Sequence, residues 1–83
     1  MPKITEYLPC VTLKQVRLQK KLTQTELAIL LIQSGHHINS NFISRFESGH
    51  SRPWPAARKA IASVLEMSEF ELFPEYQQQT PLD

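Results

Sequence analysis

The stretch Asn41–Pro53, NFISRFESGHSRP, decides the fold expected for this chain. Just before it, Asn39 is a good N-cap for a helix, because its side chain can accept a hydrogen bond from an amide in the first turn. Gly49 is placed to end that helix in the left-handed conformation. Apolar residues alternate with small polar and basic ones at helical spacing. The stretch therefore predicts an amphipathic helix over about residues 39–48, followed by a basic segment that a proline closes.

The residues upstream predict a second helix that begins at about Gln24. Thr23 and Glu26 have the spacing of a capping box, in which the hydroxyl accepts from a free amide and the carboxylate reaches back. Gly35 is the expected terminator. It follows five consecutive apolar residues, 28–32, which is more than one buried helix face needs.

A first helix is expected over about residues 13–20. Thr12 and Gln15 again have capping-box spacing, and the residues that follow alternate in an amphipathic pattern. Residues 1–11 contain two prolines and are predicted to form an extended N-terminal arm. Four apolar side chains of the arm are candidates to lie on the core: Ile4, Tyr7, Leu8 and Val11.

Two further helices complete the expected fold. Pro55 is well placed as the first residue of a fourth helix, and Ser68 as the cap of a short last turn. Residues 75–83 are polar and are predicted to form a flexible tail. No segment shows the alternation of a strand. The sequence thus predicts an all-α domain, a small five-helix bundle over residues 12–74.

Length and composition limit the class of protein. Eighty-three residues form one small domain. Nothing at the N-terminus resembles a signal peptide, and no apolar run reaches the ~18 to 20 residues of a bilayer span. A cytoplasmic protein without a membrane partner is therefore expected. The single cysteine, Cys10, is expected to be a buried thiol. Because His36, His37 and His50 lack thiols or carboxylates at metal-site spacing, no metal or other cofactor is expected.

The charges are unevenly distributed along the chain. Residues 1–59 hold all nine Lys and Arg residues and three of the eight acids, whereas residues 60–83 hold five acids and no base. This pattern is compatible with one face that binds a phosphate backbone, and equally with ordinary surface charge. The net charge of +1 by itself argues for no polyanionic partner.

Three blocks of the sequence resemble the Cro and phage-repressor type of helix-turn-helix, often called the XRE family. They are LKQVRLQKKLTQTELA, ISRFESG and RPWPAARKAIASVLEMSEFELF, in this order over residues 13–73. The resemblance implies a lambda-repressor-like fold. It also implies a sequence-specific regulator of transcription that binds double-stranded DNA, a repressor more readily than an activator, as a homodimer on a two-fold site. No catalytic set and no small-molecule ligand is expected, so the chain is not predicted to be an enzyme.

The resemblance also assigns contacts to individual residues. Base contacts are expected from the start of the second helix and the outward face of the third: Gln24, Ser40, Asn41, Ser44 and Arg45. Phosphate contacts are expected from Asn39, His50, Ser51 and Arg52. Arg45 can pair with guanine and Asn41 with adenine, while Ile43 and Phe46 point the other way. Phe42 lies at the edge of the outward face, where a core position is commoner than a thymine-methyl contact.

The family's recurrent Arg and Glu stand at Arg17 and Glu47, which implies a structural ion pair between the first helix and the end of the third. The sequence also departs from the family pattern. Its spacing from Leu27 to Ile43 is five residues longer, so the second helix and the turn after it are expected to be extended. Lys21 replaces a helix-ending glycine, which predicts a costly left-handed conformation there.

The extra apolar turn, Leu30–Ile32, is expected to be covered, because contiguous exposed apolar patches are rare in monomers. One candidate cover is the N-terminal arm through Tyr7, Leu8 and Val11, and the other is a partner subunit. A dimer would use this extended helix or the residues around Phe70, Leu72 and Phe73. The competing function is a protein-binding module with the same fold and little affinity for DNA, which the low net charge and the altered turn favour.

Overall fold

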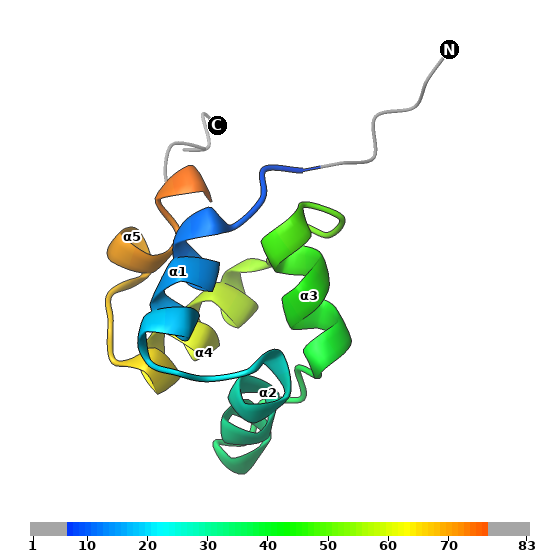
Figure 1. Ribbon diagram of the computed structural model, residues 1–83, viewed down its shortest axis with the longest axis vertical. Helices are drawn as coiled ribbons and strands as arrows, with labels where there is room; N and C mark the ends of the chain where they lie inside the picture. Colours follow the sequence, from blue (N-terminus) through cyan, green and yellow to red (C-terminus); the bar gives the residue numbers. More distant parts are fainter. Residues whose placement is uncertain (1–6, 77–83) are drawn as a thin grey trace.

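The structure is a computed structural model that describes residues 7–76, which fold into five α-helices and one 3₁₀ turn, without a strand in that range (Figure 1). Their bounds are α1 (Val11–Gln19), α2 (Gln24–Gln33), α3 (Ser40–Ser48), α4 (Pro55–Leu65), α5 (Glu69–Leu72) and η1 (Pro74–Tyr76). The predicted all-α bundle of five helices is confirmed. None of these helices combines the length and apolar character that a bilayer span requires.

One hydrophobic core joins the helices. Its fully buried side chains come from every α-helix and include Leu13, Leu27, Leu31, Ile43, Phe46, Ile61, Leu72 and Phe73. Helices α2 and α3 pack against each other, and α1 packs against α3. Because Ile43 and Phe46 are both 0% exposed, they fix which side of α3 faces the core.

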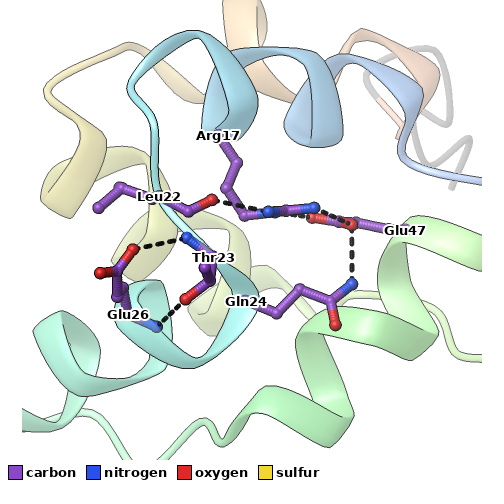
Figure 2. Close-up of polar contacts among 6 residues, drawn as sticks. All are labelled: Arg17, Leu22, Thr23, Gln24, Glu26 and Glu47. Carbon is purple, nitrogen blue, oxygen red and sulfur yellow. Dashed lines mark hydrogen bonds and ion pairs between the residues drawn. The ribbon is translucent and has the colours of Figure 1, made fainter.

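The predicted starts of α2, α3 and α5 are confirmed. The Thr23 hydroxyl accepts from the Glu26 amide at 3.0 Å and the Glu26 carboxylate accepts from the Thr23 amide at 2.8 Å, so the capping box is complete (Figure 2). Asn39 Oδ1 accepts from the Phe42 amide at 3.0 Å and caps α3. A second capping box, between Ser68 and Glu71, opens α5.

The predicted start of α1 is wrong. The helix begins at Val11, and Thr12 lies inside its first turn with no capping-box partner at Gln15. The Thr12 hydroxyl donates instead to Glu75 at 3.2 Å, and the Thr12 amide donates to the same carboxylate oxygen at 3.4 Å. A carboxylate from the far end of the chain therefore satisfies the first turn of α1, where negative charge is favoured.

The boundaries of the domain are wider than the sequence predicted. Glu75 and Tyr76 were expected in the flexible tail, but they form η1, and Tyr76 is buried with its hydroxyl donating to the Leu8 carbonyl at 2.7 Å. Val11 was expected in the arm and belongs to α1. Residues 1–6 of the predicted arm and 77–83 of the predicted tail lie outside the described residues.

The described part of the arm, residues 7–10, does not cover α2. The Tyr7 amide donates to the Gly49 carbonyl at 2.7 Å and the Cys10 amide donates to the Phe46 carbonyl at 3.0 Å, so residues 7–10 run along the end of α3. Helix α2 extends from the opposite end of the molecule (Figure 1). On it Ile29, Leu30 and Ile32 are 47%, 36% and 51% exposed. The prediction that the arm shelters the extra apolar turn through Tyr7, Leu8 and Val11 is therefore wrong.

One residue before α2 and one after it take left-handed backbone conformations. Lys21 has φ 59°, the left-handed conformation expected where it replaces a helix-ending glycine. This conformation costs a residue with a side chain about 1–2 kcal/mol. Gly35 has φ 90° and ends the extended helix without that cost. The α2–α3 connection therefore runs from Ser34 to Asn39 and includes both adjacent histidines.

Candidate functional site

The two sides of α3 differ in chemistry. Ile43, Phe46 and Glu47 are buried, whereas Asn41, Ser44 and Arg45 are exposed on the other side. We call the last three residues the outer face of α3. The spacing of these residues produces this division, because residues four apart lie one above the other on a helix. The outer face thus presents an amide, a hydroxyl and a guanidinium to solvent.

A hollow of ≈ 270 Å³ lies beside the outer face, at the start of α3. Asn39, Asn41, Phe42 and Arg45 line it. Asn39, Asn41 and Arg45 each carry a hydrogen-bond donor in the side chain. The Asn39 oxygen is already used in capping, but its side-chain nitrogen can still donate. The structure therefore brings together four residues that the sequence analysis had singled out separately.

Phe42 forms an aromatic cluster with Phe46 and Trp54. Its ring centroid lies 6.1 Å from that of Phe46 and 5.3 Å from that of Trp54, and its plane is nearly perpendicular to the Trp54 ring. Phe42 keeps 37% of its surface exposed. Sequence reasoning missed the part that Trp54 plays here, although the prolines on both sides of the tryptophan were a signal that its position is restricted.

The ion pair expected between Arg17 and Glu47 is present and buried. Arg17 Nε donates to Glu47 Oε2 at 2.6 Å and Arg17 Nη2 donates to Glu47 Oε1 at 3.0 Å, which is a bidentate contact (Figure 2). Arg17 Nη1 also donates to the Leu22 carbonyl at 2.7 Å. The pair thereby connects α1, the turn before α2 and the end of α3. Since Glu47 is the one acid of α3, its burial leaves the outer face without a carboxylate of that helix.

Gln24 is directed toward the ion pair. Its Nε2 donates to Glu47 Oε1 at 3.0 Å, and its Oε1 points away from Glu47 (Figure 2). The carboxylate accepts only, so it fixes which end of the amide faces inward. If Gln24 contacts a base as predicted, Oε1 is therefore the main atom that remains available for that contact. Ser40, the first residue of α3, is half-buried and less accessible than the outer face.

The loop after α3 is held against the end of that helix. The amides of His50 and Ser51 donate to the Arg45 carbonyl at 2.9 and 3.3 Å, and Nδ1 of His50 lies 2.7 Å from the Ser48 hydroxyl. The Arg52 guanidinium carbon is 5.8 Å from the centre of the Tyr76 ring. Of the residues predicted to contact phosphate, Asn39, His50 and Arg52 are exposed and Ser51 is half-buried.

Cys10 is not suited to be a reactive thiol. It is 0% exposed, and burial, followed by the negative charge of Glu75, raises the pKa of the thiol to about 12. A thiol must ionise to act as a nucleophile or a metal ligand, so this one is inert near neutral pH. Within residues 7–76, no three His, Cys, Asp or Glu side chains gather closely enough to hold a metal ion.

A scan against models of protein families gives no match for this chain, and a search of curated proteins gives none either.

Proposed function

We propose that this protein is a sequence-specific, double-stranded-DNA-binding regulator of transcription in which α2 and α3 form a helix-turn-helix. Helix α3 would lie in the major groove of the duplex. The observation that carries the proposal is the outer face of α3, which exposes Asn41, Ser44 and Arg45 while Ile43 and Phe46 anchor the opposite side in the core.

The chemistry of the outer face fits the base edges of the major groove. A guanidinium pairs with O6 and N7 of guanine, and a side-chain amide with N6 and N7 of adenine; each good bidentate contact discriminates by about 1–3 kcal/mol. The Arg45 guanidinium makes no hydrogen bond or ion pair among the described residues. Its charge is therefore available to a polyanion. Ser44 has the smallest side chain of the outer face and would let the helix approach the bases closely.

Phosphate contacts would flank these base contacts. Asn39 Nδ2 stands at the start of α3, and His50, Ser51 and Arg52 follow its end. Donors at both ends of a groove-bound helix can grip the backbone on both sides of the groove and so set the register of the protein. The buried pair of Arg17 and Glu47 would support this arrangement by holding α3 against α1.

The regulator is proposed to act in the cytoplasm as a homodimer and as a repressor, because occupation of a duplex by itself excludes other proteins. A two-fold dimer would place its α3 helices about 34 Å apart on successive turns of the duplex. Exposed apolar side chains are available to a second copy at α2, through Ile29 and Ile32, and at α5, through Phe70.

Selection of bound duplexes from a random pool tests the proposal. The expected result is a small set of related sequences with two-fold symmetry. Affinity for the selected duplex should fall steeply with salt, because each phosphate contact releases counterions. Failure to enrich any sequence, together with no binding to random duplex at low salt, would rule the proposal out.

A protein-binding module with this fold is the second candidate. It is favoured by the exposed side chains of Ile29, Leu30 and Ile32, which nothing else in residues 7–76 covers. This candidate predicts a stable complex with another protein that Ile32→Asp abolishes, and no measurable binding to any duplex. The first candidate predicts that Ile32→Asp still binds duplex and keeps its base preference within each half-site, even if a dimer formed through α2 is weakened.

A further inference from the structure

Phe42 is an apolar side chain in an otherwise polar site. Of the four residues that line the hollow at the start of α3, it is the one without a polar atom in its side chain, and 37% of its surface stays exposed. The other side chains of the hollow, Asn39, Asn41 and Arg45, suit phosphates and base edges. Phe42 therefore needs a different explanation from its neighbours.

The Phe42 ring is held in place by its contacts. Phe46, 6.1 Å away between ring centroids, is fully buried and anchors one side. Trp54 meets both phenylalanines edge to face, at 5.3 Å from Phe42 and 5.5 Å from Phe46. Edge-to-face contacts at these distances are favourable beyond the area that they bury. The exposed part of the ring is thus a fixed surface, which loses little conformational freedom when something binds to it.

We infer that Phe42 is a specificity-determining residue that contacts the C5-methyl group of a thymine. This inference rests on the proposed function, and it adds a base preference that Arg45 and Asn41 do not supply. Among the groups that base pairs present in the major groove, the thymine methyl is the apolar one, and phenylalanine is among the side chains that contact it. A thymine methyl that enters the hollow would leave water for an aromatic surface, which is the favourable transfer for such a group.

The position of Phe42 on α3 locates the thymine. Phe42 precedes Arg45 by three residues, so the two side chains lie on neighbouring turns, about 4.5 Å apart along the helix axis. Successive bases of one strand are about 3.4 Å apart. The thymine is therefore expected one or two base pairs from the guanine that Arg45 contacts, on the side toward the start of α3.

The test replaces each thymine of the selected duplex, one at a time, with deoxyuridine, which lacks only the methyl group. The wild-type protein should bind about fourfold more weakly when the thymine that faces Phe42 is replaced, since this is the factor expected for one buried methyl-sized group. Phe42→Ala should bind the thymine and deoxyuridine duplexes equally. Leu18→Ala, which truncates an exposed apolar side chain of α1 outside the proposed contacts, is the control and should retain the fourfold difference.

Photo-crosslinking gives a second readout that needs no variant. Thymine is replaced at the sensitive position by 5-iododeoxyuridine, whose iodine takes the place of the methyl group, and the crosslinked residue is identified by mass spectrometry. Crosslinking to Phe42 supports the inference. Crosslinking to another residue, no loss with deoxyuridine at any thymine near that guanine, or an undiminished loss in Phe42→Ala would overturn it. These results differ from failure of the proposed function, in which no duplex is bound at all.

Discussion

The two sides of α3 belong to one nine-residue helix but depend on different neighbours. The inner side, with Ile43, Phe46 and Glu47, is fixed by the core and by the ion pair with Arg17. The outer face, with Asn41, Ser44 and Arg45, is exposed and contributes little to the packing. If the outer face binds DNA as proposed, this short helix separates stability from recognition. Changes on one side should affect folding, and changes on the other should affect binding.

Loss of the Glu47 carboxylate should give the largest effect on stability. Glu47→Ala leaves the Arg17 guanidinium buried with only the Leu22 carbonyl as a partner, and removal of one member of a buried pair costs about 3–5 kcal/mol. Because small domains are stable by only about 5–15 kcal/mol, the variant should be largely unfolded at moderate urea. Urea denaturation followed by circular dichroism measures the change.

Two variants control this result. Glu69→Ala breaks the more exposed pair with Arg58 on α4 and α5 and should cost about 1 kcal/mol or less. The double change of Arg17→Met and Glu47→Leu removes both charges and should be far milder than Glu47→Ala, since no unpaired charge remains. If the double variant were as unstable as Glu47→Ala, the unpaired charge would not be the cause.

High pH should lower the free energy of unfolding through the thiol of Cys10. The amide of this residue donates to the Phe46 carbonyl, on the helix whose inner side faces the core. The folded protein holds the pKa of the thiol at about 12, against an ordinary value of 9.0. Between these values the unfolded chain loses the proton while the folded chain keeps it, so stability falls as pH rises above 9. We expect wild type to lose about 1–2 kcal/mol more than Cys10→Ala between pH 8 and 10.5.

The comparison with Cys10→Ala is needed because burial, followed by the negative charge of an ionised Cys10, also raises the pKa of Tyr76, so that both proteins lose some stability at higher pH through this tyrosine. Equal pH dependence of the free energy of unfolding in the two proteins would mean that the thiol is not held neutral by the fold.

Truncation of the outer face should give the smallest effect on stability. Asn41→Ala and Ser44→Ala remove exposed groups that take no part in capping or packing, so each should change the free energy of unfolding by less than about 0.5 kcal/mol. Thermal unfolding measures this directly. A large loss in either variant would show that the outer face also supports the fold.

The sequence predicted those parts of the fold that local chemistry determines. The caps of α2, α3 and α5 depend on a hydroxyl, amide or carboxylate within three residues of the amide that it satisfies, and all three were predicted correctly. The division of α3 into Ile43 and Phe46 inside and Arg45 outside follows from helical periodicity. The ion pair of Arg17 and Glu47 came from the resemblance to a family and not from spacing.

Contacts between distant parts of the chain were not predictable. Thr12 was given a local partner, whereas its hydroxyl donates to Glu75, and Tyr76 was placed in a tail, whereas it holds the Leu8 carbonyl. Both errors arise because polar residues near a chain end look alike whether or not a tertiary contact orders them. The side-chain amide of Gln24 was assigned to a base contact because no local signal shows that its nitrogen faces Glu47.

Arg45→Ala tests the central claim most directly, when its affinity for the selected duplex and for a random duplex is measured by fluorescence anisotropy at fixed salt. Lys59→Ala, which removes an exposed cation from α4, is the matched control. The proposed role predicts that Arg45→Ala loses about 1–3 kcal/mol of the preference for the selected duplex, the share of one bidentate base contact, while Lys59→Ala keeps the preference. An undiminished preference in a folded Arg45→Ala protein would contradict the assignment of the outer face of α3 to base recognition.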